Sequence, residues 1–144
     1  MIAGGCRCGA CRYELALDAL PPVYCCHCTD CQCWSGSAFS EQAVIPAGAV
    51  TTTGPVIEFT LSTPSGAQTH QRACGICHTR LWNINSARPA VATVRAGTLD
   101  DNRTLTPRAH IWVRSKQSWV VLPEGVPQWP EMAPLAEFMA ALAG

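Results

Sequence analysis

The chain has 144 residues, of which 48% are apolar and only 14% are charged, and its ten Lys and Arg residues balance its ten Asp and Glu residues. This length fits one domain, residues 1–144, and the balanced charge gives no electrostatic case for a nucleic-acid or anionic-membrane partner. No stretch approaches the roughly 20 apolar residues that span a bilayer, and the start MIAGGCRCGA lacks the features of a signal peptide, so we expect a soluble, cytoplasmic protein.

Segments of strand length follow one another along most of the chain, because 11 Pro and 11 Gly residues interrupt it at short intervals. Several segments alternate apolar and polar residues and are rich in β-branched or aromatic side chains, and none contains an internal proline. The predicted strands are 11–17, 38–45, 56–61, 68–73, 79–84, 90–96, 109–113 and 118–122. The pattern predicts a mainly β fold.

Two short helices are predicted among these strands. The first covers 29–34 and begins at Thr29, a residue type favoured as an N-cap. The second covers about 131–143, where Pro134 suits a first helical turn. Apolar residues recur there at helical spacing, at Leu135, Phe138, Met139 and Leu142. We interpret the second helix as an amphipathic element that packs on the sheet.

The ten cysteines are the unusual feature of the composition, and the cellular compartment decides their use. In a secreted chain they would form disulfides, whereas the reducing cytosol favours metal ligation. The motifs at 6–8 (CRC) and 74–77 (CGIC) each offer two thiolates from a tight turn. Four thiolates form the ligand set of a structural zinc, which would staple two distant segments of a small β domain. The alternatives are four buried free thiols and, for the CGIC motif, a redox pair, although no βαβ pattern surrounds it.

A denser group of cysteines lies in the stretch YCCHCTDCQCW at 24–34. The spacing of Cys26, Cys28 and Cys31 allows a turn and the start of a helix to aim three thiols at one ion. Three protein ligands leave a fourth position open, which is typical of a reactive zinc, and backbone N–H groups at a helix start favour thiolates. The spacing therefore predicts an open, catalytic metal site.

Three further cysteines bear on this prediction. Cys25 and Cys26 are adjacent on an extended segment and point in opposite directions, which argues against both as ligands of one ion. Cys33 is the more credible fourth ligand, and it would convert the open site into a closed structural one. We interpret Cys11, Cys25 and Cys33 as free thiols.

The four histidines are predicted to lie outside the ligand sets. His27 stands between two predicted ligands and is interpreted as a solvated side chain or as one that contacts a ligand. His70 and His110 lie on predicted strands as core or surface residues. His78 follows the CGIC motif at a turn position where φ > 0 is favoured, which Gly adopts best and His occasionally. A ligand role for His78 is the alternative, although four thiols are already present.

Five segments of the chain resemble the successive motifs of one known family. They are GGCRCGACRYE (4–14), CHCTDCQCWSGSAFS (26–40), CGICHTRLW (74–82), AGTLDD (96–101) and HIWVRSKQSWVVLPEGVP (110–127). The family is that of glutathione-dependent formaldehyde-activating enzymes, whose domain is shared with centromere protein V. The resemblance implies a β-tent fold of small antiparallel sheets, stapled by a structural zinc. The structural zinc maps onto Cys6, Cys8, Cys74 and Cys77, and the catalytic zinc onto Cys26, Cys28 and Cys31.

The resemblance also implies an activity, the condensation of formaldehyde with glutathione to S-(hydroxymethyl)glutathione, which is classed as a carbon–sulfur lyase reaction. Ser35, Gly36 and Ser37 are candidate donors to a glutathione carboxylate, with a plain turn as the alternative. Asp30 or His27 would handle the proton. Two other functions compete: a carrier of glutathione or another small thiol, and a zinc-stabilised interaction domain, which the absence of basic appendages disfavours. The sequence leaves the oligomeric state open.

Overall fold

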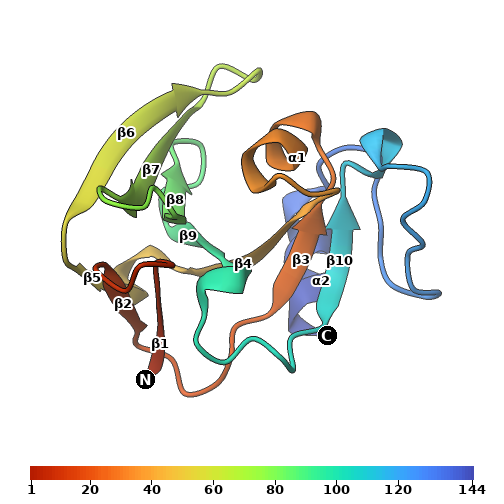
Figure 1. Cartoon of the computed structure of the whole chain (residues 1–144). Helices are drawn as coiled ribbons and strands as arrows, with labels where there is room; N and C mark the ends of the chain where they lie inside the picture. Colours follow the sequence, from red (N-terminus) through yellow and green to blue (C-terminus); the bar gives the residue numbers. More distant parts are fainter. The chain divides into compact units, whose positions relative to one another are not determined.

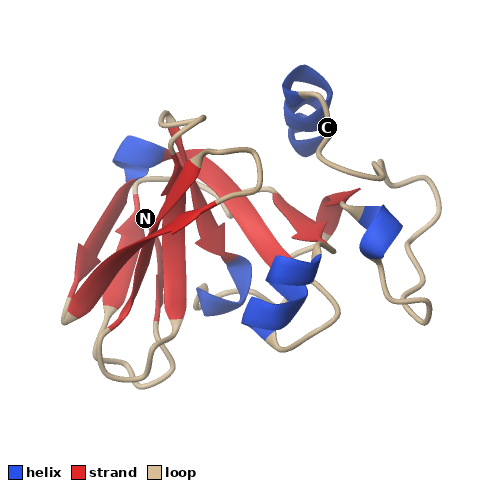
Figure 2. Cartoon of the chain, turned by 90° about the horizontal axis from the view of Figure 1, so that it is seen from above, coloured by secondary structure: helices blue, strands red, loops and turns tan.

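The computed structural model describes residues 1–144, and strands make up most of its regular structure (Figure 2). The strands are β1 (Ile2–Gly5), β2 (Arg12–Leu15), β3 (Val23–Cys26), β4 (Ser40–Pro46), β5 (Val50–Thr53), β6 (Val56–Ser62), β7 (Gln68–Cys74), β8 (Arg80–Asn85), β9 (Val91–Arg95) and β10 (Pro107–Ile111). The α-helices are α1 (Thr29–Ser35) and α2 (Leu135–Ala143). The prediction of a mainly β fold with small sheets and a short C-terminal helix is confirmed. Neither helix has the length and apolar character needed to cross a membrane.

The chain folds into two compact units. Unit 1 comprises residues 1–21 and 43–104, and unit 2 comprises residues 22–42 and 105–144. β4 begins in unit 2 and ends in unit 1. The expectation of one domain over residues 1–144 stays a prediction.

In unit 1, β1, β2 and β5 form a small antiparallel sheet with β2 at its centre (Figure 1). β2 alternates exposed and buried residues, and the inward side chains of Tyr13 and Leu15 are at most 1% exposed. β1 was not predicted, because its sequence IAGG has little strand propensity. Gly4 permits the pairing, since a Cβ there would lie 2.3 Å from the Tyr13 hydroxyl oxygen.

The second sheet of unit 1 has the strand order β4-β9-β8-β7-β6, and β6, β7, β8 and β9 pair antiparallel. Ile45, Leu81 and Val94 are at most 1% exposed and belong to its buried core. β7 ends at Cys74, and residues 75–79 turn the chain back into β8. The Cys74 backbone N–H closes this turn by donating to the Thr79 carbonyl at 2.9 Å. The hairpin therefore presents the CGIC motif at one end of the sheet.

In unit 2, β3 lies between β10 and the start of β4. All four residues of β3 are buried, which is typical of a strand that is covered on both faces. β3 pairs with β10 in parallel, so the expectation of antiparallel sheets is wrong for this pair. A parallel pair needs a long connection, and the 80 residues between Cys26 and Pro107 supply it.

α2 packs against β10, as predicted, and the ring of Phe138 meets Tyr24 edge to face at 4.9 Å. The helix begins at Leu135 and not near 131, because Pro134 occupies the N-cap position and accepts the first helical bond from Phe138 at 2.9 Å. Of the predicted apolar stripe, Phe138 and Leu142 are buried, whereas Leu135 and Met139 are 55% and 41% exposed. One narrow face of α2 therefore carries the packing.

The predicted strand at 118–122 is wrong. Val120 is buried, but Trp119 and Val121 on either side of it are 69% and 88% exposed. The Val120 backbone N–H turns back to the Gln117 carbonyl at 3.1 Å, and the Lys116 ammonium donates to the Val120 carbonyl at 2.7 Å. These bonds close a tight turn, so no partner strand is needed to satisfy the backbone.

Candidate metal centres

The first cysteine cluster lies within unit 1 and joins the two predicted motifs. Its four sulfurs, from Cys6, Cys8, Cys74 and Cys77, all lie within 4.8 Å of one another. The Cys8 sulfur is 3.5 Å from that of Cys6 and 3.8 Å from that of Cys74. A tetrahedral zinc with Zn–S bonds of about 2.3 Å separates its sulfurs by about 3.8 Å. The four sulfurs therefore fit one tetrahedral metal ion.

Hydrogen bonds to the sulfurs support the same assignment. The Cys6 sulfur accepts from the Cys11 backbone N–H at 3.2 Å, and the Cys74 sulfur accepts from two N–H groups of the turn, at Ile76 and Cys77. The hydroxyl and the backbone N–H of Thr79 lower the pKa of the Cys77 thiol to about 5. These contacts favour thiolates, the form in which cysteine binds metals.

His78 completes the turn with φ 61°, the left-handed conformation that was predicted for this position. An L-residue in this region carries a strain of about 1–2 kcal/mol that glycine avoids. The His78 side chain is exposed, so its ring adds little packing.

We expect His78→Gly to raise the free energy of unfolding by about 0.5–1 kcal/mol, and His78→Val to lower it by at least about 1 kcal/mol. The measurement is denaturant unfolding of the zinc-loaded protein. A glycine variant less stable than the wild type would contradict the strain argument and point to a ligand role for the imidazole.

The second cluster lies within unit 2, where β3 leads into α1. The sulfurs of Cys26, Cys28 and Cys31 lie within 4.8 Å of one another. Cys28 is the N-cap of α1, in place of the predicted Thr29, and its sulfur accepts from the Cys31 backbone N–H at 3.3 Å. The Cys31 sulfur accepts from the Gln42 side-chain amide at 3.4 Å. The start of the helix thus gathers three sulfurs, as the spacing predicted.

The thiols of this cluster differ in their pKa values. Hydrogen bonds from Cys26 and Cys31 hold the pKa of the Cys28 thiol far below its usual range, and the same contacts raise the pKa of Cys26. One thiolate stabilised by two neighbouring thiols is a site that a cation can enter by displacing protons.

Neither of the two neighbouring cysteines joins this cluster. Cys25 lies on β3 beside Cys26 and is buried, and burial raises the pKa of its thiol to about 12. Cys33 is exposed on α1. The cluster therefore contains three sulfurs, and Cys33 does not supply a fourth.

His27 is fully buried, so the expectation of a solvated side chain is wrong. Its Nε2 lies 3.0 Å from Nδ1 of His110, which is also buried. Burial lowers the pKa of both imidazoles, that of His27 to about 4. The pair is a buried contact between the cysteine loop, which carries His27, and β10, which carries His110.

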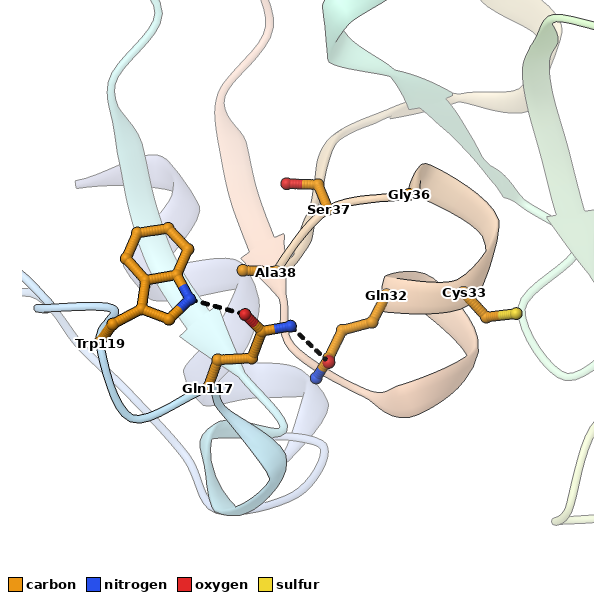
Figure 3. Close-up of a pocket in the computed structure, with 7 residues that line it drawn as sticks. All are labelled: Gln32, Cys33, Gly36, Ser37, Ala38, Gln117 and Trp119. Carbon is orange, nitrogen blue, oxygen red and sulfur yellow. Dashed lines mark hydrogen bonds between the residues drawn. The ribbon is translucent and has the colours of Figure 1, made fainter.

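A pocket with a volume of about 570 Å³ adjoins α1 in unit 2. Figure 3 shows its lining residues, which are Gln32, Cys33, Gly36, Ser37, Ala38, Gln117 and Trp119. This volume lies in the range of small-molecule sites, and the pocket is shallow and open to solvent. Gln32, Gln117 and Trp119 were not predicted as site residues. Trp119 lay within the predicted strand 118–122, and the spacing of Gln32 and Gln117 in the sequence does not show that they meet.

The candidate donors at 35–37 only partly face this pocket. Gly36 and Ser37 line it, but Ser35 does not, and its hydroxyl donates to the Phe39 carbonyl at 3.0 Å. The Gly36 backbone N–H ends α1 by donating to the Gln32 carbonyl, and the Ser37 N–H donates to the Ser35 hydroxyl. Most donors of this turn therefore have acceptors within the turn, and their role toward glutathione stays a prediction.

The family model described as "Glutathione-dependent formaldehyde-activating enzyme" matches residues 1–115. The chain belongs to this family. The matched residues include both cysteine clusters and α1. Membership in the formaldehyde-activating family supports a glutathione-dependent function of that general kind and indicates an enzyme.

A solved structure has the same fold as this chain. It is the crystal structure of a Rhodobacter sphaeroides protein, a Northeast Structural Genomics target, with a TM-score of 0.55 and 17% sequence identity. The similarity covers 74% of this chain and 92% of the other. No curated protein matches the chain.

Proposed function

We propose that the chain is a zinc-dependent enzyme that joins glutathione to formaldehyde, an S-(hydroxymethyl)glutathione synthase of the carbon–sulfur lyase class. The observation that carries the proposal is the cluster of three sulfurs at Cys26, Cys28 and Cys31, which leaves a tetrahedral metal one position for an exogenous thiol. Family membership supports glutathione and formaldehyde as the substrates.

Zinc is the metal that best fits both donor sets. Soft thiolate ligands select zinc, copper(I) or iron–sulfur clusters, and tetrahedral sets of four sulfurs are typical of structural zinc. The cluster of four would hold a structural zinc, and the cluster of three a catalytic one. None of the ten cysteines forms a disulfide, which fits the reducing cytoplasm, and we propose that location.

Cys26, Cys28 and Cys31 would hold the zinc, which would supply an open position that keeps the incoming thiol ionised near neutral pH. The chain keeps this cluster ordered through the Cys31 N–H and the Gln42 amide, which donate to the sulfurs of Cys28 and Cys31. The glutathione sulfur attacks the aldehyde carbon, a C–S bond forms, and the carbonyl π electrons move to oxygen. That oxygen gains one proton to replace the one lost from the thiol. Because three anionic ligands weaken the Lewis acidity of zinc, orientation of the two reactants contributes most to the rate.

Asp30 is the better candidate for the proton transfer. It lies exposed in the first turn of α1, one residue before Cys31. His27, the alternative, has no exposed surface and directs Nε2 at His110. Asp30 is therefore open to solvent and directly precedes a cysteine of the proposed catalytic cluster, as a general acid–base residue requires.

Metal removal tests the proposal. We expect about two zinc ions per freshly purified chain. A mild chelator should remove one of them, and added glutathione should slow that removal. Stripped protein should lose its acceleration of S-(hydroxymethyl)glutathione formation, and added zinc should restore it. Elemental mass spectrometry and a rate assay above the uncatalysed background provide the two measurements.

The same assay separates the competing functions. A carrier of glutathione would sequester the thiol in proportion to its concentration and leave the rate at or below the uncatalysed value. One tightly held zinc that glutathione does not affect, with no acceleration, would favour an interaction domain.

A further inference from the structure

The pocket beside α1 is lined by neutral residues only, among them the Trp119 indole and the carboxamides of Gln32 and Gln117. We propose that this pocket binds the uncharged, amide-bearing part of the thiol substrate, with the Trp119 indole as its wall and the Gln117 carboxamide as its hydrogen-bonding group. The inference rests on the proposed function, since it assigns residues that select the thiol. It concerns a different set of side chains from the metal ligands.

Trp119 is a large apolar side chain that is 69% exposed and yet oriented by a hydrogen bond. Its indole N–H donates to the Gln117 Oε1 at 2.6 Å. The turn that carries it is closed by the bonds from Lys116 and from the Val120 N–H, and it is anchored by the buried Val120 side chain. An ordered, exposed indole offers a ligand a rigid aromatic face at little cost in conformational entropy.

The two carboxamides are held in a fixed orientation by a chain of hydrogen bonds (Figure 3). The Gln32 Nε2 donates to two backbone carbonyls, of His27 at 2.8 Å and of Ser115 at 3.0 Å. Because carbonyls only accept, Gln32 must turn its Oε1 toward Gln117, whose Nε2 donates to it at 3.3 Å. Gln117 must then turn its own Oε1 toward the indole N–H, which only donates. The carbonyls of His27 and Ser115 therefore fix the orientation of the Gln32 amide, and through it the orientation of the Gln117 amide that accepts from Trp119.

These hydrogen bonds leave the Gln117 carboxamide with one N–H donor and one acceptor lone pair for a ligand. A carboxamide has two N–H donors and two acceptor lone pairs, and the bonds to Gln32 and Trp119 use one of each. A peptide amide presents a donor and an acceptor together and so matches what remains. The pocket offers no cationic side chain to pair with a carboxylate. Its chemistry selects the amide and not the charged ends of a peptide thiol.

The pocket and the three-sulfur cluster share one structural element. Gln32 follows Cys31 directly on α1, and its amide bonds to the carbonyl of His27, which lies between Cys26 and Cys28. The same side chain thus orders the cysteine loop and the pocket wall. A substrate amide bound at Gln117 would therefore have a fixed position relative to the loop that carries the metal ligands.

Binding of S-methylglutathione and of N-acetyl-S-methylcysteine amide by the zinc-loaded full chain tests the inference. Both probes carry amides and neither has a free thiol, and the second has no carboxylate. We expect Trp119→Ala and Gln117→Leu to weaken the binding of both probes, by about tenfold for the indole. Val121→Ala is the matched control, because Val121 lies on the same loop, is 88% exposed and does not line the pocket. Calorimetry gives the dissociation constants.

The outcomes separate this inference from the proposed function. Amide probes whose binding falls in both pocket variants support the inference even if no acceleration of the formaldehyde reaction is found. If the reaction is accelerated, Trp119→Ala should raise KM for glutathione and leave kcat within about twofold. Unchanged binding in both variants, or binding of the glutathione probe alone, would overturn the inference and leave the zinc chemistry standing.

Discussion

Replacing Cys74 by serine is expected to leave most of the chain unfolded at 37 °C. Cys74 is fully buried at the end of β7, and its sulfur lies 3.8 Å from that of Cys8. In small metal-dependent domains the free energy of structural zinc binding is also folding free energy, of order 10 kcal/mol. A hydroxyl ligates zinc poorly, so the loss should exceed about 4 kcal/mol, which corresponds to at least about 12 °C in Tm.

Cys25→Ser is the matched control for this variant. Cys25 is as buried as Cys74, at 1% exposed, but it lies outside both clusters. Burying a hydroxyl in its place should cost only about 1–3 kcal/mol. Thermal unfolding followed by circular dichroism, together with zinc content, compares the two. Equal losses in both variants would mean that Cys74 acts only as a buried side chain and holds no metal.

The sequence predicted the cysteine clusters well because local spacing decides which thiols can converge. A turn motif such as CGIC presents both sulfurs on one side whatever the rest of the chain does. The start of α1 does the same for Cys28 and Cys31. Joining Cys6 to Cys74 depends on tertiary structure, and the sequence supplied this pairing only through the chemistry of a four-ligand metal.

Other parts of the fold depend on contacts that spacing does not encode. β3 was not predicted because its residues VYCC do not alternate, being buried on both faces. The apolar residues of 118–122 are β-branched or aromatic and so predicted a strand, whereas the Lys116 ammonium satisfies the Val120 carbonyl in a turn. The pocket was not predicted either, since Gln117 meets Gln32 and Trp119 meets Gln117 only when this turn forms.

Replacing Cys28 by serine is expected to lower kcat/KM for glutathione and formaldehyde by at least about 100-fold while the protein stays folded. The sulfur of Cys28 faces those of Cys26 and Cys31, and it would be one of only three protein ligands. Cys28 is also the N-cap of α1, and the serine hydroxyl can accept the same N–H bond, because serine is among the preferred N-cap residues. The Tm should therefore change by only a few degrees.

Cys33→Ser separates loss of a ligand from loss of any thiol on α1. Cys33 lies on the same helix, is exposed and takes no part in the three-sulfur cluster. Its replacement should leave two zinc ions per chain and full activity, whereas Cys28→Ser should retain only the structural zinc. Activity lost in both variants would mean that Cys33 moves into the cluster when metal binds and closes it. Activity retained in Cys28→Ser would place the chemistry outside this cluster, because two thiolates on a mobile ion cannot hold a substrate thiol in one position.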